Sequence, residues 1–210
     1  MQESIAFFIG AFISLFAIIN PFSTVSVFHA ITRKDSKKKN RKIAQIAIVI
    51  SICVLIFFVF FGDYVLRLFN ISIDSFIIAS GILVFLVGYK MIKGDRSHIN
   101  EEDKKHAMRK DDISIIPLAI PMISGPGAMA TALVLMENSN SDIFNIVGIV
   151  FAIVSVCLIT YFLLLKAHSV DRYIGKIGVK VIDKIMGLIV LVMGVQFIVN
   201  GLIGILSGLL

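Results

Sequence analysis

Of the 210 residues in this chain, 58% are hydrophobic and only 16% are charged, proportions that exclude an ordinary soluble protein and point to lipid as the solvent. The net charge of +6 would suit nucleic acid, but the basic loops lack interleaved aromatic residues, so we expect a lipid bilayer and no nucleic acid as partner. Cys53 and Cys157 both fall inside apolar segments, and no spacing of Cys or His predicts a disulfide framework, a metal site or a cofactor.

Apolar segments follow one another along the chain, and each is predicted to cross the membrane as an α-helix. Crossing the hydrocarbon core takes about 20 residues. The six segments are residues 4–32, 43–62, 75–89, 113–136, 143–165 and 185–210. The third is short, but residues 71–73 can extend it, and Asp74 and Lys90 can reach outward from its ends. The sequence therefore predicts an all-α integral membrane protein with six transmembrane helices.

Basic residues predict the orientation of these helices. All 20 Lys and Arg residues except Arg67 lie in three connections, residues 33–42, 90–110 and 166–184. Lys and Arg near the ends of spans are retained in the cytoplasm. We therefore predict a multi-pass protein of the cell (inner) membrane, with these three connections inside and both chain termini outside.

The polar run NEEDKKHAMRKDD, residues 100–112, divides the chain into two halves of three spans each. We predict residues 1–92 as a first three-helix repeat, residues 93–112 as a charged cytoplasmic loop and residues 113–210 as a second repeat. Because three is an odd number of spans, the second repeat runs through the bilayer inverted relative to the first. Inverted repeats of this kind are typical of secondary transporters, which work by alternating access.

Glycines near the end of each half support the interpretation of the two halves as repeats. When the third and sixth spans are aligned, Gly81 matches Gly187 and Gly88 matches Gly194. A spacing of seven residues is nearly two helical turns, so each pair lies on one helix face. We expect these glycines to let a neighbouring helix approach closely.

Prolines predict a break in the first and fourth helices at mid-membrane. In the alignment of the halves Pro21 matches Pro126, and proline removes one helical hydrogen bond while favouring the first position of a new helix. Asn20 is predicted to cap the helix that begins at Pro21, and Ser124 or Gly125 the helix that begins at Pro126. Non-helical backbone survives in a membrane only where protein or a water-filled cavity surrounds it, so both breaks should face inward.

The breaks predict what the protein binds. A helix N-terminus presents free amides that suit a carboxylate, and the carbonyls that end the preceding half-helix suit an ammonium group or a sodium ion. A small zwitterion such as an amino acid satisfies both, with the amides around Ser23, Thr24, Gly127 and Ala128 as the expected carboxylate ligands. The predicted substrate-binding residues are Asn20, Pro21, Ser23, Thr24, Ser124, Gly125, Pro126, Gly127 and Ala128 at the breaks, and Gln196 in the sixth span.

Other polar residues in the spans are given structural roles. Asp183 is placed at the cytoplasmic start of the sixth span, where it should support insertion and folding more than substrate affinity, and no carboxylate relay of a proton pump is expected. Ser51, Ser80, Ser155, Thr160, Gln196 and Asn200 are predicted to form hydrogen bonds between helices, with Gln196 the best exception.

The motifs INPFS, residues 19–23, and PLAIPMISGPGA, residues 117–128, resemble those of the MarC family of bacterial and archaeal integral membrane proteins, and the resemblance covers nearly the whole chain. It implies six spans and, by analogy with members described as transporters, small neutral amino acids such as alanine and glycine as substrates. By resemblance Asn20, Pro21 and Ser23 take the place of the first motif, and Gly125, Pro126 and Gly127 that of the second.

Alternative functions stay open at the level of sequence. A channel or an exporter for another small solute would share the broken helices. An intramembrane enzyme would need a base beside Ser23 or Ser124, but His98, His106 and His168 fall in predicted cytoplasmic loops, so no enzymatic activity is expected. A coupling ion, Na⁺ or H⁺, and a homo-oligomer are both compatible with the sequence.

Overall fold

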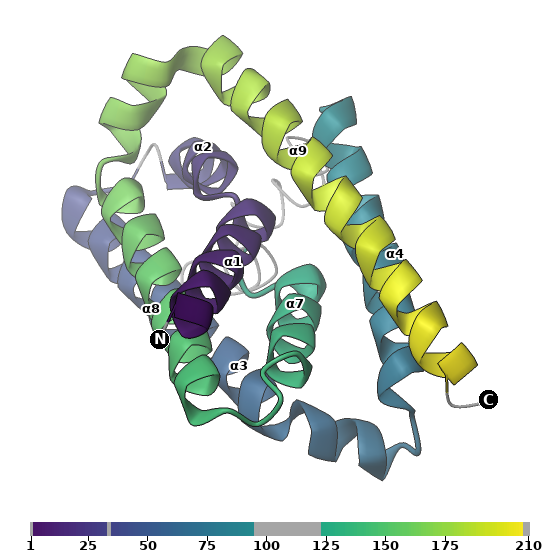
Figure 1. Cartoon of the computed structure of the whole chain (residues 1–210). Helices are drawn as coiled ribbons and strands as arrows, with labels where there is room; N and C mark the ends of the chain where they lie inside the picture. Colours follow the sequence, from purple (N-terminus) through teal and green to yellow (C-terminus); the bar gives the residue numbers. More distant parts are fainter. Residues whose placement is uncertain (1, 33–34, 95–122, 208–210) are drawn as a thin grey trace.

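The computed structural model describes residues 2–32, 35–94 and 123–207, and all regular structure in these residues is helical (Figure 1). The helices are α1 (Gln2–Ile19), α2 (Pro21–Thr32), α3 (Lys37–Leu68), α4 (Ile73–Lys93), α7 (Pro126–Glu137), α8 (Ile143–Leu165) and α9 (Ala167–Ser207). Apart from Lys93 and Gly94, the predicted charged loop lies outside the described residues, as do residues 113–122 of the predicted fourth span.

Five helical stretches among the described residues are long and apolar enough to cross a membrane. They are Glu3–His29, which includes nearly all of α1 and most of α2, then α3, α4, α8 and the Ile177–Ser207 part of α9. The described part of the predicted fourth span is the shorter apolar helix α7. Large hydrophobic side chains such as Phe61, Phe151 and Val192 are exposed on the outer faces, where lipid can cover them. The prediction of an all-α multi-pass membrane protein is therefore confirmed.

Polar side chains define where several helices begin. Ser36 accepts a hydrogen bond from the Lys39 amide at the start of α3, and Asp142 accepts one from the Phe144 amide at the start of α8. Each bond satisfies one of the amides that a helix start leaves without an internal partner. Within α9 the helix is interrupted at Gly175, whose φ of 66° lies in the left-handed region that glycine tolerates.

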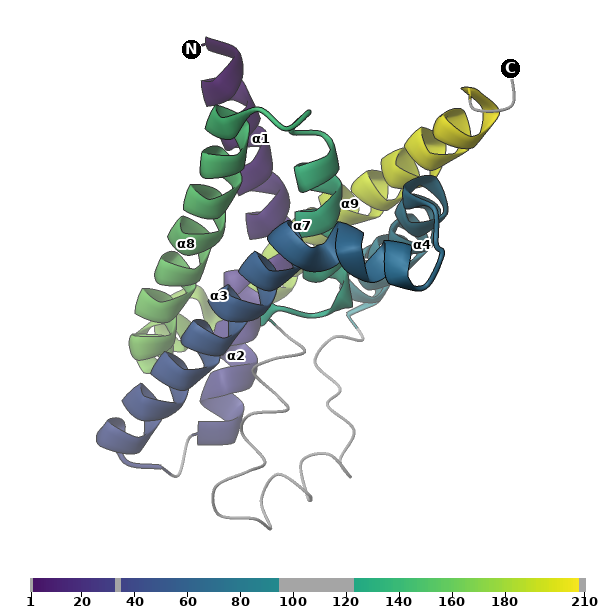
Figure 2. The same cartoon turned by 90° about the horizontal axis from the view of Figure 1, so that it is seen from below.

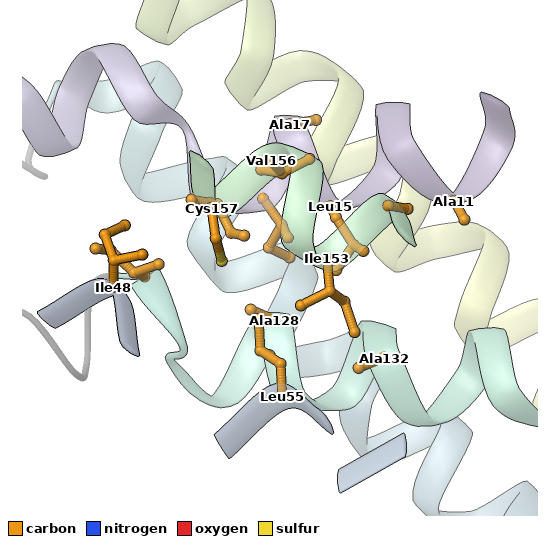
Figure 3. Close-up of a cluster of buried hydrophobic side chains, with 14 of the residues drawn as sticks. Ala11, Leu15, Ala17, Ile48, Leu55, Ala128, Ala132, Ile153, Val156 and Cys157 are labelled. Atoms are coloured by element: carbon orange, nitrogen blue, oxygen red, sulfur yellow. The ribbon is translucent and has the colours of Figure 1, made fainter. Parts of the chain in front are cut away.

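The core lies where α1, α3, α7 and α8 meet. Leu15 of α1, Leu55 of α3 and Ile153 of α8 are fully buried in one cluster with the small side chains of α7. In Figure 3 the side chain of Leu55 points toward Ala128 of α7. Cys157 is buried in the same cluster, as expected for a small apolar side chain, whereas Cys53 is exposed.

Glycines hold α4 and α9 against each other, and the two helices lie side by side in Figure 1. A Cβ atom added at Gly81 would lie 2.7 Å from the Gly194 carbonyl oxygen, and one at Gly187 would lie 3.1 Å from the Gly88 carbonyl oxygen. The two backbones are therefore in direct contact. The predicted close approach at these four glycines is confirmed.

The contacts along this glycine seam come in matched pairs. An added Cβ at Gly88 would meet the backbone nitrogen of Leu191, and one at Gly194 would meet the backbone nitrogen of Phe85. Gly194 takes the place of Gly88 in the alignment of the third and sixth spans, and Leu191 takes the place of Phe85. The contact of Gly88 with Leu191 therefore corresponds to the contact of Gly194 with Phe85.

Both ends of the described chain lie on one side of the molecule. Figure 2 shows the start of α1, the turn between α7 and α8 and the end of α9 along the upper edge, with the end of α2 and the start of α3 at the lower edge. Which side faces the cytoplasm stays a prediction.

Candidate functional site

Asn20 forms the break in the first span. It lies between α1 and α2 with a φ of 45°, a left-handed conformation that asparagine tolerates better than most residues. Its side chain is fully buried, and Oδ1 accepts a hydrogen bond of 3.3 Å from the Ser23 amide, while Pro21 occupies the first helical position. The predicted break and the predicted cap by Asn20 are both present.

The Asn20 side chain also reaches the last helix. Its Nδ2 donates a hydrogen bond of 2.7 Å to Oδ1 of Asp183 on α9. Asp183 lies six residues after Ile177, where the long apolar part of α9 begins, so it is about 9 Å inside this helix. The helix thus begins before the predicted sixth span, and Asp183 contacts the predicted site residue Asn20, while its predicted place at the membrane entry stays a prediction. The signal that could have found it is the buried Asn20 amide, because a buried amide needs acceptors.

The first turn of α2 already uses the amides predicted to bind a carboxylate. The Ser23 amide donates to Asn20 Oδ1, and the Thr24 amide donates to the Asn20 carbonyl at 3.1 Å. The Thr24 hydroxyl donates to the Ile19 and Asn20 carbonyls, each at 3.1 Å. Asn20 thus accepts the hydrogen bonds of both amides. The Ser23 and Thr24 amides are therefore not available as ligands in this conformation.

The second break is built differently. Gly125 takes the N-cap position of α7 with Pro126 directly after it, and no side chain of the cap residue bonds to the helix. The Met129 amide donates to the Gly125 carbonyl at 3.0 Å and begins the helical ladder, so the Gly127 and Ala128 amides precede it. Of the two predicted caps, Gly125 fills the position and Ser124 lies fully buried before it.

The two breaks touch. A Cβ atom added at Gly127, in the first turn of α7, would lie 3.0 Å from Cδ1 of Ile18, in the last turn of α1. It would also lie 3.9 Å from Cγ2 of Val84 on α4. The end of α1 and the start of α7 therefore meet inside the protein, with α4 beside them.

Buried hydroxyls flank the second break. Ser51 on α3 and Ser80 on α4 are at most 1% exposed, and neither Oγ has a hydrogen-bond partner in the described part of the chain. Ser80 lies one turn from Val84, which is next to Gly127, and Ser51 lies one turn from Leu55, which points toward Ala128 (Figure 3). The prediction that these two serines bond between helices is wrong. Thr160 also bonds within its own helix, to the Val156 carbonyl at 2.8 Å.

Comparison with known proteins decides the family. The family model described as "MarC family integral membrane protein" matches residues 5–206. The chain belongs to the MarC family. The resemblance of the two proline motifs is thereby confirmed.

Similar MarC family relatives are named UPF0056 membrane proteins. One from Methanocaldococcus jannaschii is 38% identical over 199 residues, covering 94% of this chain and 97% of the relative. YhcE of Escherichia coli is 36% identical over 202 residues, covering 95% of this chain and 93% of the relative. YvbG of Bacillus subtilis is 33% identical over 202 residues, covering 95% of each chain. No solved structure matches, and neither the family description nor these names indicate an enzymatic activity.

Gln196 is the predicted site residue that this MarC family structure does not bring to the breaks. It lies 13 residues after Asp183 on α9, about 20 Å further along the helix axis. Its side chain is exposed and donates to Asn200 Oδ1 at 2.8 Å within the same helix. The contacts that are present join Ile18, next to the first proline motif, to Gly127 in the second, and Asn20 to Asp183 on α9.

Proposed function

We propose that this MarC family protein is a secondary transporter of small neutral amino acids such as alanine and glycine. The observation that carries the proposal is the contact between the two helix breaks, at Gly127 and Ile18. Broken helices that meet inside a membrane protein are the usual setting for a small charged substrate. Amino acids match this setting because they carry both charges on a few atoms.

The start of α7 supplies the carboxylate end of the proposed site. A helix N-terminus carries roughly half a positive charge and points amide N–H groups at its ligand. Gly125 caps α7 without a side-chain bond, and the absence of a side chain at Gly127 lets Ile18 of α1 pack against this turn. The Gly127 and Ala128 amides are therefore the proposed ligands, in preference to those of Ser23 and Thr24.

The unpartnered hydroxyls support a polar ligand at the same place. Leaving a buried hydroxyl without a hydrogen bond costs on the order of 1–3 kcal/mol, so one that persists needs an explanation. Ser51 and Ser80 both lie one turn from residues beside the start of α7. A substrate bound there can form hydrogen bonds with the Ser51 and Ser80 hydroxyls, which have no partner in the described part of the chain.

Inverted repeats are the proposed basis of transport. The matched contacts of Gly88 with Leu191 and of Gly194 with Phe85 are what a twofold axis between α4 and α9 would produce. We take residues 1–92 and 113–210 as the two repeats. Both chain termini then lie on the non-cytoplasmic side of the inner membrane. If each repeat can adopt the conformation of the other, the breaks would open first to one side of the membrane and then to the other.

Counterflow in liposomes tests the proposal. Purified protein is reconstituted into liposomes that are preloaded with unlabelled alanine or glycine, and labelled substrate is added outside in trace amounts. A transporter should accumulate label transiently, since internal substrate exchanges for it. Linear uptake without saturation or exchange would indicate a channel and contradict the proposal.

The carboxylate requirement has its own test. Alaninamide keeps the ammonium group of alanine but replaces the carboxylate by an uncharged amide. We expect it to compete poorly with labelled alanine. Equal competition by alanine and alaninamide would show that the broken helices serve something other than a carboxylate.

A further inference from the structure

α3 begins with basic side chains that the packing of the helices leaves exposed, at the lower edge of the molecule in Figure 2. The exposed basic residues of its first two turns are Lys37, Lys38, Arg41 and Lys42. The acidic residue just before the helix, Asp35, is already paired with Lys39 at 3.2 Å. Among the described residues, none of the four exposed basic side chains forms an ion pair.

The four charges repel one another. Residues four apart are neighbours on a helix surface, and like charges at this spacing destabilise the helix. Lys38 and Lys42 form one such pair, and Lys37 and Arg41 form another. After Lys42 the next acidic residue of α3 is Asp63, about 32 Å further along the axis, and α8, which packs against α3, has no acidic residue. The start of α3 therefore carries an excess of positive charge that an anion would stabilise.

The same face of α3 continues into an apolar stripe. Ile46, Val49 and Cys53 follow Lys42 at helical spacing, and all three are exposed. In a membrane, acyl chains cover such a face. α3 is about 48 Å long, whereas the hydrocarbon core is about 30 Å thick, so its first two turns can lie at the level of the head groups. A phospholipid on this stripe thus has its phosphate beside the basic residues.

From this arrangement we infer that the start of α3 binds an anionic phospholipid, with its phosphate at Lys38, Arg41 and Lys42 and an acyl chain along the stripe from Ile46 to Cys53. A soluble anion would match the charge but would not cover the stripe. A zwitterionic lipid such as phosphatidylcholine would bring a cationic choline group among the lysines, so the site prefers a lipid with a net negative charge. The inference goes beyond the proposed transport and does not depend on it.

Cys53 provides a probe of the stripe in the full-length protein. It is exposed while Cys157 is buried, so a fluorescent maleimide labels Cys53. Cys53 lies 11 residues after Lys42, about 16 Å further into the bilayer, which is the depth of the acyl chains. Lipids with brominated acyl chains quench a fluorophore that they contact, so quenching reports which lipid occupies the stripe.

Two samples of labelled protein are compared in nanodiscs of phosphatidylcholine. Each contains the same minor fraction of brominated lipid, as phosphatidylglycerol in one and as phosphatidylcholine in the other. We expect brominated phosphatidylglycerol to occupy the stripe at least about fivefold more, and this preference to fall as salt is raised. Equal quenching by the two lipids would overturn the inference.

Matched double variants locate the preference. Lys38→Gln with Lys42→Gln should abolish it, while thermal stability in detergent stays unchanged or rises because a like-charge pair is gone. Lys90→Gln with Lys93→Gln removes the same charge from exposed positions at the end of α4 and should leave the preference unchanged. If both double variants reduce it equally, the lipid responds to the net charge of the protein, and the assignment to α3 is wrong.

Discussion

Asn20 meets three demands that no other residue type meets together. It adopts a φ of 45°, its carbonyl oxygen Oδ1 caps α2, and its Nδ2 donates to Asp183. Aspartate would keep the cap but has no N–H to donate, and glycine would tolerate the backbone but offers neither bond. The sequence predicted the cap because Asn-Pro is a local signal. It did not predict the partner, because Asp183 is 163 residues away.

Two variants at Asn20 separate the backbone from the side chain. Asn20→Ala and Asn20→Gly both lose the cap and the bond to Asp183, but only alanine is strained in the left-handed region. We expect Asn20→Ala to be less stable than Asn20→Gly by about 1 kcal/mol. Unfolding of the purified proteins in mixed detergent and SDS measures the difference. An alanine variant at least as stable as the glycine variant would contradict the strained conformation.

Gly127 and Ser23 differ in what they give to the substrate. A Cβ at Gly127 would already lie 3.0 Å from Ile18 Cδ1, so the branched side chain of Gly127→Val must displace Ile18 and cover the amides of α7. Ser23→Ala removes at most one neutral hydrogen bond, about fivefold in affinity. We expect Gly127→Val to weaken alanine binding by far more, with thermal stability as the control. The opposite order would place the ligand at α2.

Helices could be predicted from the sequence where an apolar run is continuous. The face of a helix on which a given residue lies could be predicted less well. The apolar runs gave the long helices, and Pro126 gave the start of α7. Gln196 was chosen because it is polar and in the middle of a span, yet α9 turns it outward, and the same helix turns Asp183 inward. Rotation of a helix about its axis is set by packing, such as the glycine seam with α4, which residue types alone do not show.

The glycine seam predicts a contrast between positions of the same residue type. Leucine at Gly88 would collide with the Leu191 backbone and must separate α4 from α9, at a cost of several kcal/mol because backbone cannot yield as a side chain does. Gly10→Ala on α1 is the control, because a Cβ there has nothing within 4 Å. Helix propensity should make this control neutral or more stable by up to about 1 kcal/mol.

Thermal unfolding of both glycine variants in one detergent measures the contrast. We expect a lower midpoint for Gly88→Leu and an unchanged or higher midpoint for Gly10→Ala. Equal midpoints would mean that α4 and α9 do not depend on their close contact.

Orientation in the membrane is a property of the whole molecule. The distribution of Lys and Arg predicts it, whereas the packing of the helices does not determine it. A reporter active only in the cytoplasm should work when fused after Lys39 and stay silent after Asn140 or Leu210. The reason is that nearly all basic residues lie in three connections on one side of the predicted spans. A reporter that works after Asn140 and fails after Lys39 would reverse the orientation, with expression of each fusion checked by immunoblot.

The hydrogen bond between Asn20 and Asp183 also sets an order for biogenesis. Its partners are 163 residues apart, so at about 5–20 residues per second the first break waits roughly 10–30 s for Asp183 to be synthesised. During this interval the Asn20 amide sits in a newly inserted helix without its acceptor on α9. The first break therefore completes its hydrogen bonds only after the last helix has been synthesised, and a chain that stops before Asp183 leaves the Asn20 amide without this acceptor.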